Sequence, residues 1–235
     1  MNDNFVFIDN VYRSRLTLLD ILEERGYNVE KYRKFSPAEA TAAATAYPSL
    51  SFKVSKKDDE TKVCDVRYAN ISRQKLDTFF NDIEDTDTEN TEVIVMMIQP
   101  VADAHHVIAL KQYMKLKESG DKDSGNKDSG NKESGNKDSG NKERRKLRVS
   151  FFNIETIVIN PMRHVLVPKH QIVPPADHQE LMNSLYITAK SKLPEIKFHV
   201  DPIARCIGAV PGDIVKITRP SGSAGESIIY RLCAP

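Results

Sequence analysis

The sequence predicts an α+β protein, in which an N-terminal α/β/α layer is followed by a small mixed β-sheet with one main helix. Two observations lead to this fold class. Up to about residue 117, apolar residues alternate between helical spacing and short strand-like runs. Beyond residue 150, short β-branched runs are separated by glycine and proline. At 235 residues, the chain is long enough for two modest domains.

The N-terminal layer is predicted to begin with an amphipathic helix over residues 11–25, which Gly26 ends. A second helix starts at Ser36, because Pro37 suits the first helical position and Glu39 completes a capping box. The remaining elements of this half are strands at 50–54 and 63–68, an amphipathic helix at 72–83, a strand at 92–98 and a helix at 102–117. Within the strand at 92–98, the run from 93 to 98 is continuously apolar, which predicts burial on both faces.

A polar repeat occupies residues 118–142, in near copies of the pentad Asp-Ser-Gly-Asn-Lys. It contains no apolar side chain, so it cannot offset the entropy of ordering itself. We therefore expect a flexible polar spacer, since its acidic residues lack the clustered spacing of a calcium-binding loop. The basic run at 143–148 is either a phosphate-contacting or nuclear-import patch, or the solvated entry to a strand at 149–152.

The last third predicts a compact β unit. Short extended pieces are expected at 156–158 and 164–167, and one helix at 177–189. Pro202 fixes its own φ and biases Asp201 towards an extended conformation. Gly208 and Gly212 bracket a tight loop, and strands at 213–217 and 227–232 flank a turn at 219–225.

Composition argues against several classes of protein. The formal net charge is +1, so any contact with nucleic acid must come from a local patch. Cys64, Cys206 and Cys233 are far apart and odd in number, which favours buried thiols over disulfides or a zinc site. The first ten residues lack the basic and apolar regions of a signal peptide, and no apolar run approaches membrane-spanning length.

We predict no catalytic residue, no metal site and no cofactor. At fold level, the N-terminal pattern resembles restriction-type nucleases, which need acidic metal ligands and a lysine on neighbouring strands. Asp65 lies on one predicted strand, but residues 93–98 of the next contain neither an acid nor a lysine. His105 and His106 are adjacent on a helix and point about 100° apart, so they do not easily share a metal ion.

The most specific residues form three runs in the last third: Asp201-Pro202-Ile203-Ala204-Arg205, Arg219-Pro220-Ser221 and Tyr230-Arg231-Leu232. Together with His-Val-Leu-Val-Pro-Lys-His at 164–170, they resemble the C-terminal assembly domain of the fifth-largest subunit of eukaryotic nuclear RNA polymerases, and the archaeal counterpart of that subunit. The resemblance covers nearly all of 147–235. Upstream it is thinner, resting on Arg25-Gly26-Tyr27 after the first helix. Cys206, Pro211 and the run at 222–226 depart from the family pattern.

The resemblance implies a jaw domain over 1–156, with the repeat at 118–142 as an insertion, and a polymerase-assembly domain over 157–235. It implies a non-catalytic subunit that binds the largest polymerase subunit and neighbouring small subunits, and lies near downstream duplex DNA with weak, non-specific contact. The expected location is the nucleus, or a viral factory or virion if the source is a large DNA virus.

Three sets of residues follow from this resemblance. Those expected to bind the polymerase core are Arg205, Lys216, Arg219, Ser221 and Arg231. Those expected to have structural roles are His164, Pro168, His170, Asp201, Pro202, Gly208, Gly212, Gly225 and Tyr230. Those expected near DNA are Gln99, Pro100 and Lys111. An alternative function is that of a diverged paralogue, a polymerase-bound regulatory adaptor without DNA contact, which the insertion and the weakened jaw loop at 99–102 favour.

Overall fold

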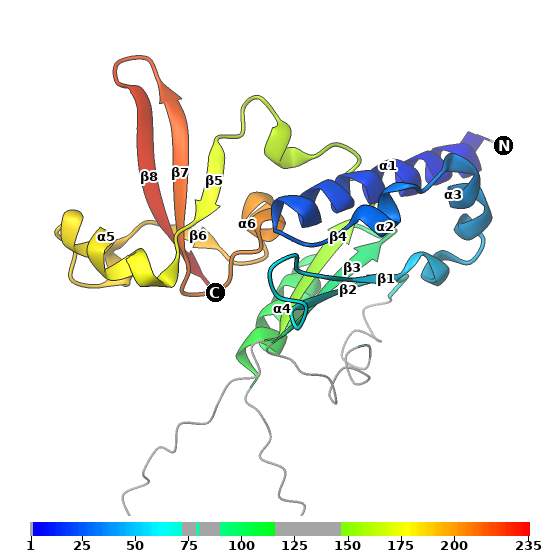
Figure 1. Ribbon diagram of the computed structural model, residues 1–235, viewed down its shortest axis with the longest axis horizontal. Coiled ribbons are helices and arrows are strands. Elements are labelled where there is room, and N and C mark those ends of the chain that lie inside the picture. The colour runs from blue at the N-terminus through cyan, green and yellow to red at the C-terminus, as the bar shows by residue number, and fades with distance from the viewer. Residues whose placement is uncertain (1, 72–78, 80–89, 116–146) are drawn as a thin grey trace, which may run out of the picture.

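The computed structural model describes residues 2–71, 79, 90–115 and 147–235 (Figure 1). The predicted helix at 72–83 lies almost wholly outside these residues, as does the whole repeat at 118–142. Among the described residues, the fold contains two four-stranded mixed sheets, one in each half of the chain. This confirms the α+β class.

The N-terminal half forms a layered unit. Its elements are α1 (Asn2–Glu24), α2 (Glu30–Arg33), α3 (Pro37–Ala44), η1 (Tyr47–Leu50), β1 (Phe52–Ser55), β2 (Val63–Tyr68), β3 (Thr91–Met97), α4 (Asp103–Met114) and β4 (Arg148–Asn153). The strand order is β1-β2-β3-β4. The β1–β2 pair is antiparallel, and the β2–β3 and β3–β4 pairs are parallel.

Side chains of β3 alternate between the two faces of this sheet, as the continuously apolar run predicted. Ile94 and Met96 join an apolar cluster with α1, whereas Val93, Val95 and Met97 join a cluster that includes Ala109 of α4. All five side chains are fully buried. The central strand therefore holds a helix on each face, which gives the α/β/α layers.

Local signals placed several N-terminal elements correctly. The Ser36 hydroxyl accepts from the Glu39 N–H at 3.2 Å, and a Glu39 carboxylate oxygen accepts from the Ser36 N–H at 2.7 Å. This capping box is the one that the sequence predicted. The first helix is longer than predicted, because it begins at Asn2 rather than at residue 11. It ends before Gly26, whose φ is +85°.

The C-terminal half builds the second sheet. Its elements are η4 (Pro161–Arg163), β5 (Lys169–Ile172), η5 (Pro175–Asp177), α5 (His178–Ser184), η6 (Lys190–Lys192), β6 (Glu195–Lys197), α6 (Pro202–Ile207), β7 (Ile214–Ser221) and β8 (Gly225–Ala234). The strand order is β5-β7-β8-β6, with only the β6–β8 pair parallel. The β7–β8 hairpin projects away from the N-terminal layer (Figure 1).

Several local predictions in this half were wrong. Residues 219–221 continue β7 instead of turning, because Arg219 pairs with Ser227 and Ser221 pairs with Gly225 across the hairpin. The segments at 156–158 and 164–167 are turns, and the strand lies at 169–172, where it pairs with β7. The helix expected at 177–189 ends at Ser184, and a second short helix, α6, follows Asp201.

The two halves share one apolar cluster. It joins Val149 and Phe151 of β4 to Phe198 and to Val215 and Ile217 of β7. Cys64, Cys206 and Cys233 are buried free thiols, as predicted. None of the helices among the described residues combines the length and apolarity needed to cross a membrane.

Candidate functional site

A buried ionic cluster lies where α1, β3 and β4 meet the C-terminal half. One Glu92 oxygen, Oε2, accepts hydrogen bonds from the Arg25 guanidinium, from the Tyr27 hydroxyl at 3.0 Å and from Arg148 Nη1 at 3.2 Å. Burial by itself would raise the pKa of Glu92, but Arg25 and Arg148 outweigh it and hold the pKa at about 2. Glu92 is therefore ionised, and all of its contacts in this cluster are made through Oε2.

Gly208 of the C-terminal half packs closely against the same two guanidinium groups. It follows α6 as a left-handed C-cap with φ +77°. A Cβ atom at this position would lie 2.6 Å from Arg25 Nη2 and 2.7 Å from Arg148 Nη1. Glycine is therefore required here both by the backbone conformation and by the close approach of two arginines.

The outer edge of β4 is capped by two side chains from the C-terminal half. The Phe151 N–H donates to His199 Nε2 at 2.9 Å, and Arg205 Nη1 donates to the Phe151 carbonyl at 2.8 Å. Since Nε2 accepts, the proton of neutral His199 is on Nδ1, which donates to His106 Nδ1 at 2.7 Å. Burial and the nearby Arg205 lower the pKa of His199 to about 2.

Sequence reasoning missed Glu92 and His199 as important residues. Glu92 stands one position before the apolar run of the strand at 92–98, and His199 belongs to none of the predicted groups of residues. The only local signal at His199 is geometric: its φ is +59°, which few residues other than glycine adopt. Their partners come from distant parts of the chain, so spacing along the sequence carried no sign of them.

The residues expected to bind the polymerase core divide into two groups. Arg205 points inward, to β4 and the Phe152 ring. The others lie on the β7–β8 hairpin, where Arg219 is exposed and Lys216 pairs with Tyr230 across the strands. Arg231 Nη1 donates to the Glu195 carbonyl at 2.9 Å, and the Ser221 hydroxyl accepts from the Ala224 N–H at 3.4 Å.

The residues expected to have structural roles lie in turns and caps. His164 Nδ1 accepts from the Leu166 N–H at 3.2 Å, and His170 Nδ1 donates to the Pro168 carbonyl at 2.7 Å. The Asp201 carboxylate caps α6 by accepting from the N–H groups of residues 203 and 204 at 2.8 and 2.9 Å, with Pro202 at the first helical position. Gly212 and Gly225 have φ of +98° and +72°.

Exposed apolar side chains gather on the loop before β5. Val165 and Leu166 are 92% and 82% exposed, and Tyr186 after α5 is 95% exposed. Side chains of this size usually lose their water when a partner binds. Lys216 and Tyr230 line a hollow of about 630 Å³ with Leu181 of α5.

The residues expected near DNA are not all at one place, since Gln99 and Pro100 lie in the loop after β3 and Lys111 lies in the last turn of α4. Gln99 donates to the Asn70 side chain, Pro100 follows in the same loop, and Lys111 is exposed on α4. The Ala102 N–H at the start of α4 donates to His105 Nδ1 at 3.0 Å. This helix-start donor is therefore satisfied within the chain. Among the described residues, no three acidic, histidine or cysteine side chains group as a metal site would need.

Comparison with known proteins identifies the class. Residues 159–233 match the family model of RNA polymerase Rpb5, C-terminal domain. The archaeal RNA polymerase subunit Rpo5 of Archaeoglobus fulgidus is 56% identical over 69 residues, which is 29% of this chain and 88% of that protein. Rpo5 of Methanosarcina barkeri is 51% identical over 69 residues, 29% of this chain and 86% of that protein.

A eukaryotic relative extends over both halves. The subunit rpabc1 of DNA-directed RNA polymerases I, II and III of Dictyostelium discoideum is 27% identical over 226 residues, 96% of this chain and 98% of that protein. The chain belongs to the Rpb5 family, which includes eukaryotic RPABC1 and archaeal Rpo5. It is a non-catalytic subunit of DNA-directed RNA polymerase.

Proposed function

We propose that residues 157–235 anchor this subunit to the largest polymerase subunit and its small neighbours, and that residues 1–156 form the lower jaw beside downstream DNA. The observation that carries the anchor is the length of the archaeal relatives. Nearly 90% of such a relative aligns to 69 residues of this chain. Proteins with that one unit are named polymerase subunits, so the unit alone is sufficient for membership of the enzyme.

The projecting hairpin and the loop before β5 are the surfaces best suited to this anchor. Arg219 is exposed near the end of the hairpin, and a guanidinium presents a rigid donor fork to carboxylates and carbonyls. Val165 and Leu166 add exposed apolar area on the loop before β5. Lys216, Ser221 and Arg231 lie on the same two strands, whereas Arg205 joins the two halves within the chain.

The full-length eukaryotic relative supports the location and the jaw. Its name assigns it to polymerases I, II and III, so we infer that this chain serves a nuclear polymerase. The proposed jaw acts by position, with Lys111 and backbone groups near Gln99 and Pro100 making weak phosphate contacts. Such contacts weaken steeply as salt rises, because bound counterions are released from the DNA.

The anchor is tested by Arg219→Ala in the full-length chain. A desolvated guanidinium leaves unpaired acceptors when it is removed, so we expect binding to the catalytic subunits to fall by on the order of 2–5 kcal/mol. Arg13→Ala is the matched control, because that exposed arginine of α1 pairs, among the residues that the structure describes, only with Asp9 four residues before it. Retention on immobilised catalytic subunits measures both variants. Normal assembly of the Arg219 variant contradicts this anchor.

The regulatory adaptor without DNA contact is the second candidate function. The specific observation in its favour is that His105 already accepts the Ala102 N–H, and Asp103 places a negative charge at the same helix start. Crosslinking from the N-terminal half to downstream DNA in the assembled polymerase separates the two functions. With a DNA-contacting jaw, Lys111→Ala reduces DNA retention at low salt and leaves assembly unchanged. Absence of any crosslink supports the adaptor.

A further inference from the structure

A cavity of about 530 Å³ opens between the two halves, next to the Arg25–Glu92–Arg148 cluster. Its walls come from the end of α1, from β5 and from α6. This volume is within the range of pockets that hold small molecules. Four cationic side chains line it, Arg25, Lys56, Arg148 and Lys169, against a single acid, Glu24.

The positive charge around the cavity is only partly neutralised. Arg25 and Arg148 share one carboxylate, Glu92, through the same oxygen. Glu24 is occupied by Arg163, whose guanidinium lies 3.4 Å from it. Lys56 and Lys169 form no ion pair with the described residues. Two guanidinium groups on one buried carboxylate leave about one uncompensated charge in a site where burial makes charge costly.

Two buried donor atoms of the arginines also have no hydrogen-bond partner among the described residues. The Arg25 side chain is only 7% exposed, and its Nη1 has no partner among the described residues. The buried Nε of Arg148 also lacks a partner there. Buried donors of this kind normally find an acceptor, because leaving them unpaired costs free energy. The other oxygen of Glu92, Oε1, is also buried without a partner among the described residues, so the unpaired atoms do not by themselves call for an anion. An anion in the cavity would supply the missing negative charge beside these buried groups.

The lining of the cavity also includes apolar side chains. Ile172 of β5, and Ile203 and Ile207 of α6, line it together with Met162. A lining that combines cationic and apolar side chains suits a ligand with a phosphate at one end and a flat or apolar group at the other. Such ligands include nucleoside monophosphates, whose phosphate Lys and Arg bind and whose base packs against aliphatic side chains.

We propose that this cavity is a phosphate-binding site, with Lys56, Lys169 and Arg148 as the phosphate ligands and the isoleucines as the surface for a base. The site is distinct from the β7–β8 hairpin and from the loop at 99–102, and it does not depend on the proposed anchor or jaw. Arg25 lines the cavity beside these ligands, and Glu92 positions Arg148 through their ion pair at 3.2 Å.

Calorimetric titration of the full-length chain with inorganic phosphate and with AMP, at constant ionic strength set by chloride, tests the proposal. Both probes are expected to bind. Tighter binding of AMP identifies a nucleotide as the source of the phosphate, and equal binding identifies free phosphate. The double variant Lys56→Gln/Lys169→Gln is expected to bind on the order of tenfold more weakly, because two charge-assisted contacts are lost.

The matched control is Lys192→Gln/Lys197→Gln, which makes the same charge change on exposed lysines outside the cavity. It should bind both probes as the unchanged chain does. Thermal unfolding without ligand checks that both double variants are folded. Absence of binding by the unchanged chain overturns the proposal, and so does equal binding by the two double variants.

Discussion

Gly208 meets two physical requirements at a single position. Its left-handed backbone ends α6, and its missing side chain lets Arg25 and Arg148 approach from the N-terminal half. Gly212, four residues later, has φ +98°, but a Cβ atom added there would meet no atom within 4 Å. The two glycines therefore separate the cost of backbone strain from the cost of a steric clash.

We predict that Gly208→Ala destabilises the protein more than Gly212→Ala. Both variants lose about 1–2 kcal/mol to a left-handed alanine. Only the first also forces the buried guanidinium groups apart, so its free energy of unfolding should fall by at least about 1 kcal/mol more. Chemical denaturation of the two variants measures the difference. Equal losses would show that the arginines move aside without cost.

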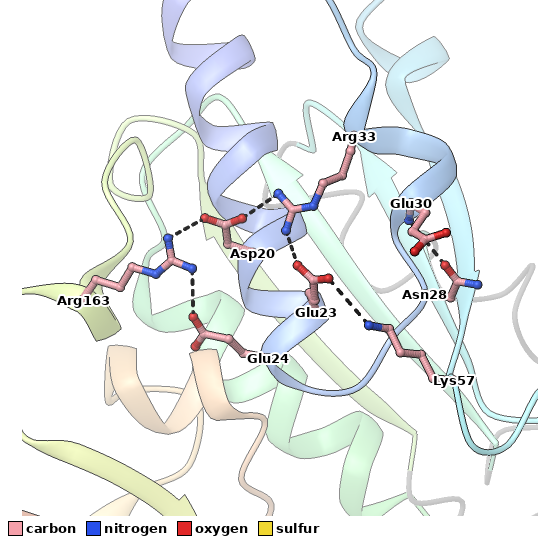
Figure 2. A network of polar contacts seen from close by, with 8 residues as sticks. All are labelled: Asp20, Glu23, Glu24, Asn28, Glu30, Arg33, Lys57 and Arg163. Carbon is pink, nitrogen blue, oxygen red and sulfur yellow. Dashed lines mark hydrogen bonds and ion pairs between the residues drawn. The ribbon is translucent and has the colours of Figure 1, made fainter.

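Glu92 supplies the negative charge of the buried cluster that it forms with Arg25 and Arg148. Removing one partner of a buried ion pair leaves the other charged and unpaired, whereas exposed pairs are largely screened by water. The chain contains both kinds. Figure 2 shows the exposed network, in which Arg163 of η4 bridges Asp20 and Glu24 on α1, while Arg33 binds Asp20 and Glu23.

Arg25→Ala and Arg163→Ala should therefore differ strongly. The Arg163 side chain is 61% exposed, so its loss should cost less than about 1 kcal/mol, and less again at high salt. The loss of the buried Arg25 should cost more, about 1.5–3 kcal/mol, because the buried Glu92 loses a charge-assisted hydrogen bond and keeps only Arg148 and the Tyr27 hydroxyl among the described residues. Urea denaturation at low and high salt gives both values. Similar costs for the two variants would contradict a larger contribution from the buried Arg25–Glu92 contact than from the exposed Arg163 pairs.

At the scale of elements, the edge of β4 depends on a neutral histidine. His199 must accept the Phe151 N–H, and Arg205, His106 and His105 all oppose a positive charge on its ring. Unfolding releases the imidazole to its ordinary pKa of 6.5. Below that pH the unfolded chain binds a proton that the folded chain does not, so stability is complete above pH 6.5 and falls as the pH is lowered.

Between pH 6.5 and 5, the free energy of unfolding should fall with a slope of up to about 1.4 kcal/mol per pH unit for this one proton. His199→Asn is less stable at neutral pH but should lose this slope, and asparagine tolerates the positive φ. His164→Asn, in an exposed loop, is the control that should keep it. Glu92 adds to this fall in stability only below about pH 4.5, because its pKa is lowered from 4.5 to about 2 in the folded chain. A slope unchanged in the His199 variant contradicts the prediction.

Elements with strong local signals were predictable, and those set by distant pairing were not. The capping box at Ser36 and the apolar run of β3 depend on neighbours in sequence, and both were placed correctly. The length of the β7–β8 hairpin depends on cross-strand register, which extended β7 through Pro220. His199 and Arg205 act on a strand 48 and 54 residues away, so no local pattern revealed them.

At the scale of the molecule, the two halves are joined by a shared core as well as by polar contacts. Phe198, Val215 and Ile217 of the C-terminal half pack with Val149 and Phe151 of β4. The archaeal relatives nevertheless align almost entirely to the C-terminal unit. That unit should therefore form its own sheet, but with an apolar face that the N-terminal half normally covers.

Residues 157–235 expressed alone are predicted to fold, with dispersed amide resonances, and to be less stable than the full chain. The exposed apolar face should also make the fragment self-associate as its concentration rises. NMR spectra and sedimentation at several concentrations test both expectations. Phe198→Ser should reduce the self-association, whereas collapsed amide dispersion in the unchanged fragment would contradict independent folding.

The capped edge of β4 also has a consequence for how the chain is made. During translation, Phe151 leaves the ribosome well before Arg205, which is 54 residues further along. At ~5–20 residues per second, that interval is roughly 3–10 seconds. Throughout it, the newest strand of the nascent sheet exposes an N–H and a carbonyl that another nascent chain can pair with. The risk of mispairing at this strand edge is therefore greater for nascent chains on crowded polysomes than for the finished subunit, in which the edge is capped.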